Sequence, residues 1–130
     1  MNCPFCVQNA VILENELAYA RMDAYPVSPG HMLIIPKRHT TDWFSLTKEE
    51  KRAVVNLLDA AKEYLEAVYH PDGYNIGINC GETAGQTIFH AHVHLIPRYH
   101  GDVDNPRGGV RGVIACKQNY PSSQNYSFLL

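Results

Sequence analysis

The chain has 130 residues, and its 11 Lys and Arg side chains nearly balance its 13 Asp and Glu side chains, giving a formal net charge of −2. This length fits one domain and excludes a two-domain enzyme, so we expect a single domain over residues 1–130. The near-neutral charge argues against a broad basic face, and we expect neither nucleic acid nor a membrane surface as a partner.

No apolar run approaches the roughly 20 residues of a membrane span, and no basic segment followed by a long apolar stretch opens the sequence. We therefore expect a cytoplasmic protein. In that reducing compartment the four cysteines are expected to be thiols or metal ligands rather than disulfides. Cys3 and Cys6 have the two-residue spacing that is typical of a ligand pair.

The first half of the chain predicts two strands followed by a long helix. Residues 17–23 and 31–36 are short apolar-rich runs, and the prolines and glycine between them are typical of a connection between strands. Thr47 and Glu50 form a capping-box pattern that predicts the start of a helix. Apolar residues then recur at spacings of three and four until residues 70–73 end the helix. These positions are Val54, Leu57, Leu58, Ala61, Leu65 and Val68.

The second half predicts two more strands, residues 74–80 and 88–99, joined by a glycine-bearing turn over residues 81–86. From residue 100 the sequence is glycine-rich, and we expect an irregular loop and tail over residues 100–130. Strands arranged around one long helix indicate an α+β domain.

Three histidines, His90, His92 and His94, alternate with apolar residues inside the last predicted strand. In a strand this alternation places three imidazoles on one face and the apolar side chains on the other. A solvated strand face is one interpretation of the pattern. A catalytic metal site is a second, because alternate histidines on one strand can share a metal, although this strand carries no Asp or Glu to assist them.

The third interpretation is nucleophilic catalysis at phosphorus by the central histidine, His92. A neutral imidazole attacks a phosphoryl group without the charge repulsion that a carboxylate meets, and water can cleave the resulting P–N bond. The flanking histidines would hold the tautomer of His92 and donate to the phosphate oxygens. This chemistry requires an unprotonated nitrogen on His92, so we expect activity to fall at low pH.

The run from His90 to Ile96 resembles the signature of the histidine triad (HIT) family, in which three histidines alternate with apolar residues. Four other segments resemble landmarks of that family, in its bacterial and fragile-histidine-triad branches. They are Gly85-Gln86-Thr87, Pro29-Gly30-His31, Pro36-Lys37-Arg38-His39 and Ile96-Pro97-Arg98. The resemblance implies a five-stranded antiparallel sheet with one long helix and a short one, paired with a second copy into a homodimer.

The resemblance also implies a nucleotide site beside the triad strand, with cleavage at the α-phosphate. His92 would take up the nucleoside monophosphate, His94 would contact the phosphate and assist the leaving group, and His90 completes the catalytic triad. Asp23 would accept hydrogen bonds from the ribose hydroxyls, and His31 would lie near the triad and orient it. Without the resemblance, Asp23 reads as an ordinary turn aspartate and His31 as a core or turn histidine.

Further positions in the resemblance would bind the phosphate groups of the substrate. Asn79 would hold the bound phosphate. The run from Gly85 through Gln86 to Thr87 would bridge phosphate and leaving-group oxygens with neutral donors. The resemblance also implies a purine nucleotide as the ligand.

Cys3 and Cys6 are half of a tetrahedral zinc set, so two further ligands must come from elsewhere. The resemblance implies His39 and His90, because some bacterial members of the family combine a similar N-terminal cysteine pair with histidines at these positions. We therefore expect a structural zinc that ties residues 1–10 to the sheet and steadies the triad strand.

Together these features predict a nucleotide hydrolase with a covalent nucleotidyl-His92 intermediate. Its substrates would be dinucleoside polyphosphates, such as diadenosine tetraphosphate, or nucleoside phosphoramidates. A nucleotidyl transferase or phosphorylase needs the same residues and is an alternative. A nucleotide-binding interaction module, in which turnover is incidental, is another.

Overall fold

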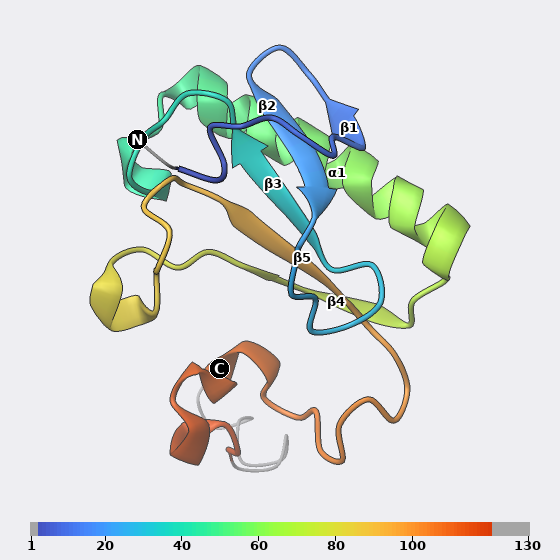
Figure 1. Ribbon diagram of the computed structural model, residues 1–130. Coiled ribbons are helices and arrows are strands. Elements are labelled where there is room, and N and C mark those ends of the chain that lie inside the picture. Colours follow the sequence, from blue (N-terminus) through green and yellow to red (C-terminus); the bar gives the residue numbers. More distant parts are fainter. Residues whose placement is uncertain (1–2, 121–130) are drawn as a thin grey trace. The chain divides into compact units, whose positions relative to one another are not determined.

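The computed structural model describes residues 3–120, which form two compact units divided between Tyr99 and His100. The first unit contains a five-stranded sheet and one long helix (Figure 1). Its strands are β1 (Leu13–Glu14), β2 (Ala18–Met22), β3 (Met32–Pro36), β4 (Gly73–Gly77) and β5 (Val93–Arg98). Its helices are the long α1 (Lys48–Tyr69) and the short 3-10 helices η1 (Trp43–Ser45) and η2 (Glu82–Ala84).

The order of the strands in the sheet is β1-β2-β3-β5-β4, and every neighbouring pair is antiparallel. This arrangement confirms the predicted α+β class, with five antiparallel strands and one long helix. Strand β1 was not predicted, because two residues are too few to show an alternating pattern. Strand β4 ends at Gly77 rather than at the predicted residue 80. The homodimer implied by the resemblance stays a prediction.

The second unit, described as far as Tyr120, contains the short 3-10 helices η3 (Gly109–Val113) and η4 (Ala115–Lys117). Within it the guanidinium carbons of Arg107 and Arg111 lie 4.6 and 5.1 Å from the ring centre of Tyr120. The part of the predicted tail beyond residue 120 lies outside the described residues. None of the helices in residues 3–120 has the length and apolar content needed to cross a membrane.

Helix α1 packs across β2 and β3 on one face of the sheet (Figure 1). The core between them is formed by Val54, Leu57, Ala61 and Leu65 of the helix and by Ala18, Ala20, Met32, Ile34, Val93 and Leu95 of the strands. Val68 was predicted on the same stripe but is 52% exposed. The neighbouring Tyr69 packs against the core in its place, because the stripe shifts round the helix in the last turn.

The opposite face of the sheet carries the polar side chains of Arg21 and His94. The register of the strands pairs Arg21 on β2 with Leu33 on β3, and it pairs Leu33 with His94 on β5. Because side chains alternate along a strand, His94 points away from the core residue Val93. Phe5 from the N-terminal segment covers part of this face by packing with Leu33.

The triad segment joins the sheet later than predicted. Strand β5 begins at Val93, whereas residues 88–99 were predicted to be a strand. The preceding residues leave the ladder because the amide of Ala91 donates to the carbonyl of Thr40 (2.8 Å), in the loop after β3. His90 is fully buried there, so the solvated-face interpretation is wrong for this histidine.

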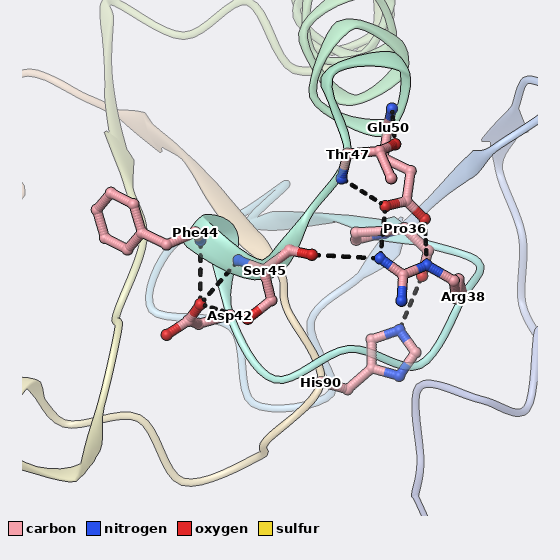
Figure 2. A network of polar contacts seen from close by, with 8 residues as sticks. All are labelled: Pro36, Arg38, Asp42, Phe44, Ser45, Thr47, Glu50 and His90. Atoms are coloured by element: carbon pink, nitrogen blue, oxygen red, sulfur yellow. Dashed lines mark hydrogen bonds and ion pairs between the residues drawn. The ribbon is translucent and has the colours of Figure 1, made fainter.

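A buried carboxylate joins the start of α1 to the chain that follows β3 (Figure 2). Glu50 accepts hydrogen bonds of 2.8 Å from both Nε and Nη2 of Arg38, and a third of 2.8 Å from the backbone amide of Thr47. The amide of Glu50 donates to Oγ1 of Thr47 (3.1 Å), which completes the predicted capping box. Because Arg38 precedes His39, this network holds the His39 segment against the helix.

The change Glu50→Gln should remove a pH-dependent part of the stability. Hydrogen bonds from Arg38, opposed by burial and assisted by Thr47, hold the pKa of Glu50 at about 2 instead of the ordinary 4.5. A depressed carboxyl pKa stabilises the fold above pH 4.5, and this stabilisation is lost as the pH falls toward 2. In urea unfolding we expect Glu50→Gln to cost about 1–3 kcal/mol at pH 7 and much less near pH 2.5.

The matched control is Glu63→Gln, because Glu63 is exposed and forms a 3.9 Å surface ion pair with Lys62. We expect it to change the free energy of unfolding by less than about 0.5 kcal/mol at either pH. A Glu50→Gln penalty of the same size at both pH values would contradict the role given to the Arg38 pair.

Candidate functional site

A cavity of about 400 Å³ opens on the sheet face opposite α1. Six of its lining residues were predicted from the sequence: Asp23, Asn79, Gly85, Thr87, His92 and His94. Seven were not: Pro4, Phe5, Arg21, Ala24, Tyr25, Leu33 and Ile88. The volume lies in the range of sites for small molecules, and apolar and polar groups both contribute to the wall.

A hydrogen bond to the backbone determines which ring nitrogen of His92 is unprotonated. Its Nδ1 lies 2.8 Å from the carbonyl oxygen of His90, and because a carbonyl only accepts, Nδ1 carries the proton. The neutral ring therefore has its lone pair on Nε2. Since His92 lines the cavity, this geometry makes a nucleophilic nitrogen available to a ligand.

His94 has the opposite tautomer because of a chain of hydrogen bonds behind it. The backbone amide of Val27 donates to Nδ1 of His31 (3.1 Å), so neutral His31 carries its proton on Nε2. This Nε2 donates to Nδ1 of His94 (2.9 Å), which leaves the proton of His94 on its own Nε2. His31 is buried and does not line the cavity, so its contacts with the site run through His94 and Asp23.

Burial keeps the rings of His31 and His94 in this hydrogen-bond chain neutral. Burial, followed by the neighbouring His92 and His31, lowers the pKa of His94 to about 4 against the opposing charge of Asp23. Burial also lowers the pKa of His31, again opposed by Asp23. At pH 7 both histidines are therefore in the neutral form that the hydrogen-bond chain requires.

Asp23 directly follows β2 and lines the cavity beside these histidines. Its Oδ1 accepts a hydrogen bond from the amide of Tyr25 (2.8 Å). Its Oδ2 lies 3.5 Å from Nε2 of His31 and 4.0 Å from Nδ1 of His94. A carboxylate oxygen has more than one lone pair, so Asp23 retains acceptor capacity for a donor in the cavity.

Ligand atoms of Asp23, His31 and His94 lie within 4.8 Å of one another, as they would around a metal ion. The tautomers argue against that use. Nε2 of His31 carries a proton and donates it to the lone pair on Nδ1 of His94, so neither nitrogen is open to a cation. These two nitrogens are therefore already used within the protein.

A second cluster joins the N-terminal segment to the triad. Sγ of Cys3 lies 3.4 Å from Nδ1 of His90, and Sγ of Cys6 lies 3.6 Å from the same nitrogen. Nδ1 of His39 lies 3.2 Å from Sγ of Cys6 and 3.2 Å from Nδ1 of His90. Neighbouring ligands of a tetrahedral zinc lie about 3.4–3.8 Å apart, given bonds of about 2.1 Å to nitrogen and 2.3 Å to sulfur. The four side chains are therefore spaced to hold one metal ion.

The donor chemistry of this cluster also fits a metal. Nε2 of His90 lies 2.7 Å from the carbonyl oxygen of Pro36 and so carries the ring proton (Figure 2). The lone pair of Nδ1 therefore faces the two cysteines. A ligating histidine whose other nitrogen donates to a backbone carbonyl is the usual arrangement at metal sites.

Phe5 lies between the two cysteines in the sequence and connects the cluster to the cavity. Its ring centre is 4.9 Å from that of His92, with an interplanar angle of 67°, and 6.1 Å from that of His90. Its backbone carbonyl accepts from the hydroxyl of Tyr19 (2.6 Å). The segment that the cluster holds thus packs against the ring of His92 and forms part of the cavity wall.

Gln86 was predicted to contact the substrate, but it does not line the cavity and is only 2% exposed. Its Oε1 accepts from the amide of Gly81 (2.8 Å), and its Nε2 donates to the carbonyls of Thr41 (2.7 Å) and Ile88 (3.1 Å). These bonds satisfy both ends of the side-chain amide. Gln86 therefore holds the turn in front of the triad rather than contacting a ligand.

Arg21 is a charged residue of the cavity wall that sequence reasoning missed. It belongs to no recognisable motif. The one signal that could have found it is its place two residues before Asp23, because alternate residues of a strand share a face.

Residues 6–101 match the family model described as the HIT domain. An uncharacterized HIT-like protein of Mycoplasma genitalium is 41% identical over 104 residues, covering 75% of this chain and 74% of that protein. The AP-4-A phosphorylase of Mycobacterium tuberculosis is 33% identical over 98 residues, covering 75% and 50%. The asymmetrical bis(5'-nucleosyl)-tetraphosphatase of Schizosaccharomyces pombe is 36% identical over 98 residues, covering 75% and 54%. The matched region thus spans about half the length of these last two proteins.

Two solved structures have the same fold. A HIT family protein from Bacillus anthracis superposes with a TM-score of 0.74 at 33% identity, covering 95% of this chain and 84% of that one. A zinc-bound histidine triad family protein from Mycobacterium smegmatis superposes with a TM-score of 0.71 at 35% identity, covering 78% of each chain.

The imidazole of His94 should titrate at about pH 4 when followed by NMR, because burial and its histidine neighbours disfavour the charged ring. The change Asp23→Asn should move the midpoint lower still, since it removes the negative charge that favours the imidazolium. As a control, Asp59→Asn changes an exposed carboxylate on α1 and should leave the midpoint in place. A His94 midpoint above pH 6 would contradict the neutral hydrogen-bond chain.

Proposed function

The chain belongs to the HIT family, and we propose that it is a nucleotide hydrolase that cleaves its substrate at the α-phosphate through a nucleotidyl-His92 intermediate. One observation carries the proposal. The hydrogen bond from Nδ1 of His92 to the carbonyl of His90 leaves an unprotonated Nε2 at the wall of a cavity of nucleotide size. A nucleophile held in this tautomer needs no separate base to activate it.

In the first step, Nε2 of His92 donates its lone pair to the α-phosphorus, and the bond from phosphorus to the leaving oxygen breaks. In the second step, water attacks the same phosphorus, the electron pair of the P–N bond returns to Nε2, and the proton of the water is released to solvent. Nε2–H of His94 stabilises the negative charge on the phosphoryl and leaving oxygens by hydrogen bonding. Because the ring of His94 is neutral, it has no readily released proton to give.

The neutral state of His94 favours one class of substrate. A polyphosphate leaves as an anion and needs no proton, whereas the amine of a phosphoramidate must be protonated as it departs. Dinucleoside polyphosphates are therefore our first choice, with nucleoside phosphoramidates second. The names of the matched proteins from Mycobacterium tuberculosis and Schizosaccharomyces pombe support this choice.

The remaining cavity residues are given binding roles. Asp23 accepts from the ribose hydroxyls, and its exposed lone pairs beside the histidines support that assignment. Asn79 and Thr87 supply neutral donors to the phosphate oxygens. Gly85 contributes only to the cavity wall, because its amide already donates to the carbonyl of Glu82 (2.9 Å). Gln86 is given no binding role, because both ends of its side-chain amide are hydrogen-bonded to backbone groups.

A phosphorylase is the second candidate. It uses the same site, with inorganic phosphate in place of water in the second step. The relative named AP-4-A phosphorylase supports this alternative. The two activities differ in their product, since water releases a nucleoside monophosphate and phosphate releases a nucleoside diphosphate.

We also propose that Cys3, Cys6, His39 and His90 hold a structural zinc, a role supported by their spacing and by the zinc-bound relative from Mycobacterium smegmatis. When bound, the ion would crosslink the N-terminal segment to the triad and take no part in the reaction. A purine nucleotide and a second copy of the chain are the partners we propose. β4 supports the second copy, because it is an edge strand and its Ile76 is 51% exposed.

The intermediate can be detected directly. After mixing with diadenosine tetraphosphate and rapid quenching, intact mass spectrometry should show the chain with one added adenosine monophosphate group. His92→Ala should abolish the adduct and reduce turnover by roughly a thousandfold or more, because the nucleophile is lost. The control His70→Asn changes a histidine at the end of α1, keeps a residue that tolerates its left-handed backbone, and should react normally.

Two outcomes would contradict the proposal. Full turnover in His92→Ala would exclude the covalent mechanism, and nucleotide binding without adduct or turnover would favour an interaction module. In water enriched in ¹⁸O, a hydrolase should place the label in the released nucleoside monophosphate. A nucleoside diphosphate formed only when inorganic phosphate is added would favour the phosphorylase.

Metal analysis tests the zinc site. The purified chain should contain about one zinc per chain, and Cys3→Ser should lose it, because three ligands hold zinc more weakly than four. Cys80→Ser is the control, since Cys80 lies outside the cluster. Zinc retained in Cys3→Ser, or lost equally in both variants, would contradict the assignment.

A further inference from the structure

Arg21 lines the cavity, yet the proposed reaction gives it no role. The register pairs it with Leu33 and pairs Leu33 with His94, so the three residues form a row across β2, β3 and β5. Neighbouring strands lie about 4.8 Å apart, which places the backbone of Arg21 about 10 Å from that of His94. All three side chains line the same cavity.

The guanidinium of Arg21 is held in a defined orientation. Its Nη1 donates to Oδ1 of Asn9 (2.7 Å), and its Nε donates to the backbone carbonyl of Met22 (3.3 Å). Within residues 3–120, Nη2 has no hydrogen-bond partner. Two of its five N–H groups are thus used, and the remaining three, one on Nη1 and two on Nη2, are donors held in a fixed plane.

The position of a bound base follows from the proposed function, on which this inference rests. With the α-phosphate at His92 and the ribose hydroxyls at Asp23, the base lies over the apolar side chain of Leu33. Asp23 follows Arg21 by two residues, so the two side chains are on the same side of the strand. The free edge of the base is then directed toward the guanidinium.

We propose that Arg21 reads the base and selects nucleotides of 6-oxopurines, guanine and hypoxanthine, over those of adenine. Two guanidinium N–H groups match the two adjacent acceptors O6 and N7 of a 6-oxopurine. Adenine presents N7 beside an amino group, which is itself a donor and meets the guanidinium with like polarity. A bidentate pair of this kind discriminates between bases by roughly 10- to 100-fold.

The test measures binding of GMP, IMP and AMP to the full chain by calorimetry, and kcat/KM for diguanosine and diadenosine tetraphosphate. GMP and IMP should bind about 10- to 100-fold more tightly than AMP, and kcat/KM should favour the diguanosine substrate by a similar factor. IMP lacks the 2-amino group of GMP. Equal preference for GMP and IMP therefore assigns the selection to O6 and N7.

Two substitutions separate hydrogen bonding from charge. Arg21→Leu removes the donors, and the ratio of the AMP and GMP dissociation constants should fall to within about threefold of unity. Arg21→Lys keeps the charge but loses the planar fork, so the ratio should fall to an intermediate value. The matched control Arg52→Leu removes an exposed arginine of α1 and should keep the wild-type ratio.

The inference is overturned if the three nucleotides bind equally, if AMP binds best, if none binds, or if Arg21→Leu keeps the preference. An equal loss for all three nucleotides in Arg21→Leu would show stacking or charge attraction instead, and would also overturn it. The two proposals fail separately. Base preference without adduct or turnover counts against the hydrolase alone, and turnover without base preference counts against the role of Arg21 alone.

Discussion

The hydrogen bond from Nε2 of His90 to the carbonyl of Pro36 fixes the orientation of the His90 ring. Both the cysteine and histidine cluster and the ring of His92 depend on this residue. With its proton on Nε2, the ring turns the lone pair of Nδ1 toward Cys3 and His39. The backbone carbonyl of the same residue accepts from Nδ1 of His92 and sets the tautomer of the proposed nucleophile. Because His90 is fully buried, it has no room to turn, and a displacement would disturb the cluster and the reactive ring together.

His92 directly precedes β5 and His94 is the second residue of that strand, yet their hydrogen-bond partners give the two rings opposite tautomers. His92 donates to a backbone carbonyl, so its free nitrogen carries the lone pair of the proposed nucleophile. His94 accepts from His31, which in turn accepts from the amide of Val27, so its free nitrogen is a hydrogen-bond donor. Backbone groups cannot exchange donor and acceptor roles, and the carbonyl of His90 and the amide of Val27 therefore determine which nitrogen carries the proton in each neutral ring.

The N-terminal segment shapes the cavity although it supplies no strand to its floor. Phe5 packs on the ring of His92, and Asn9 orients the guanidinium of Arg21. The same segment is held by the cysteine and histidine cluster, and His39 of that cluster follows Arg38, which is fastened to the start of α1 by Glu50. The helix on one face of the sheet and the cavity on the other are therefore joined through a short series of polar contacts.

By itself the sequence determined the features that depend on local periodicity: the capping box at Thr47, the apolar stripe of α1 and the face on which His94 lies. It also determined the family, because the triad is a local signature. Only the tertiary structure decided that Gln86 holds a turn and that Arg21 borders the cavity. A side chain's partners, and with them the proton positions of the triad, depend on segments distant in sequence, and no local spacing records which of these come together.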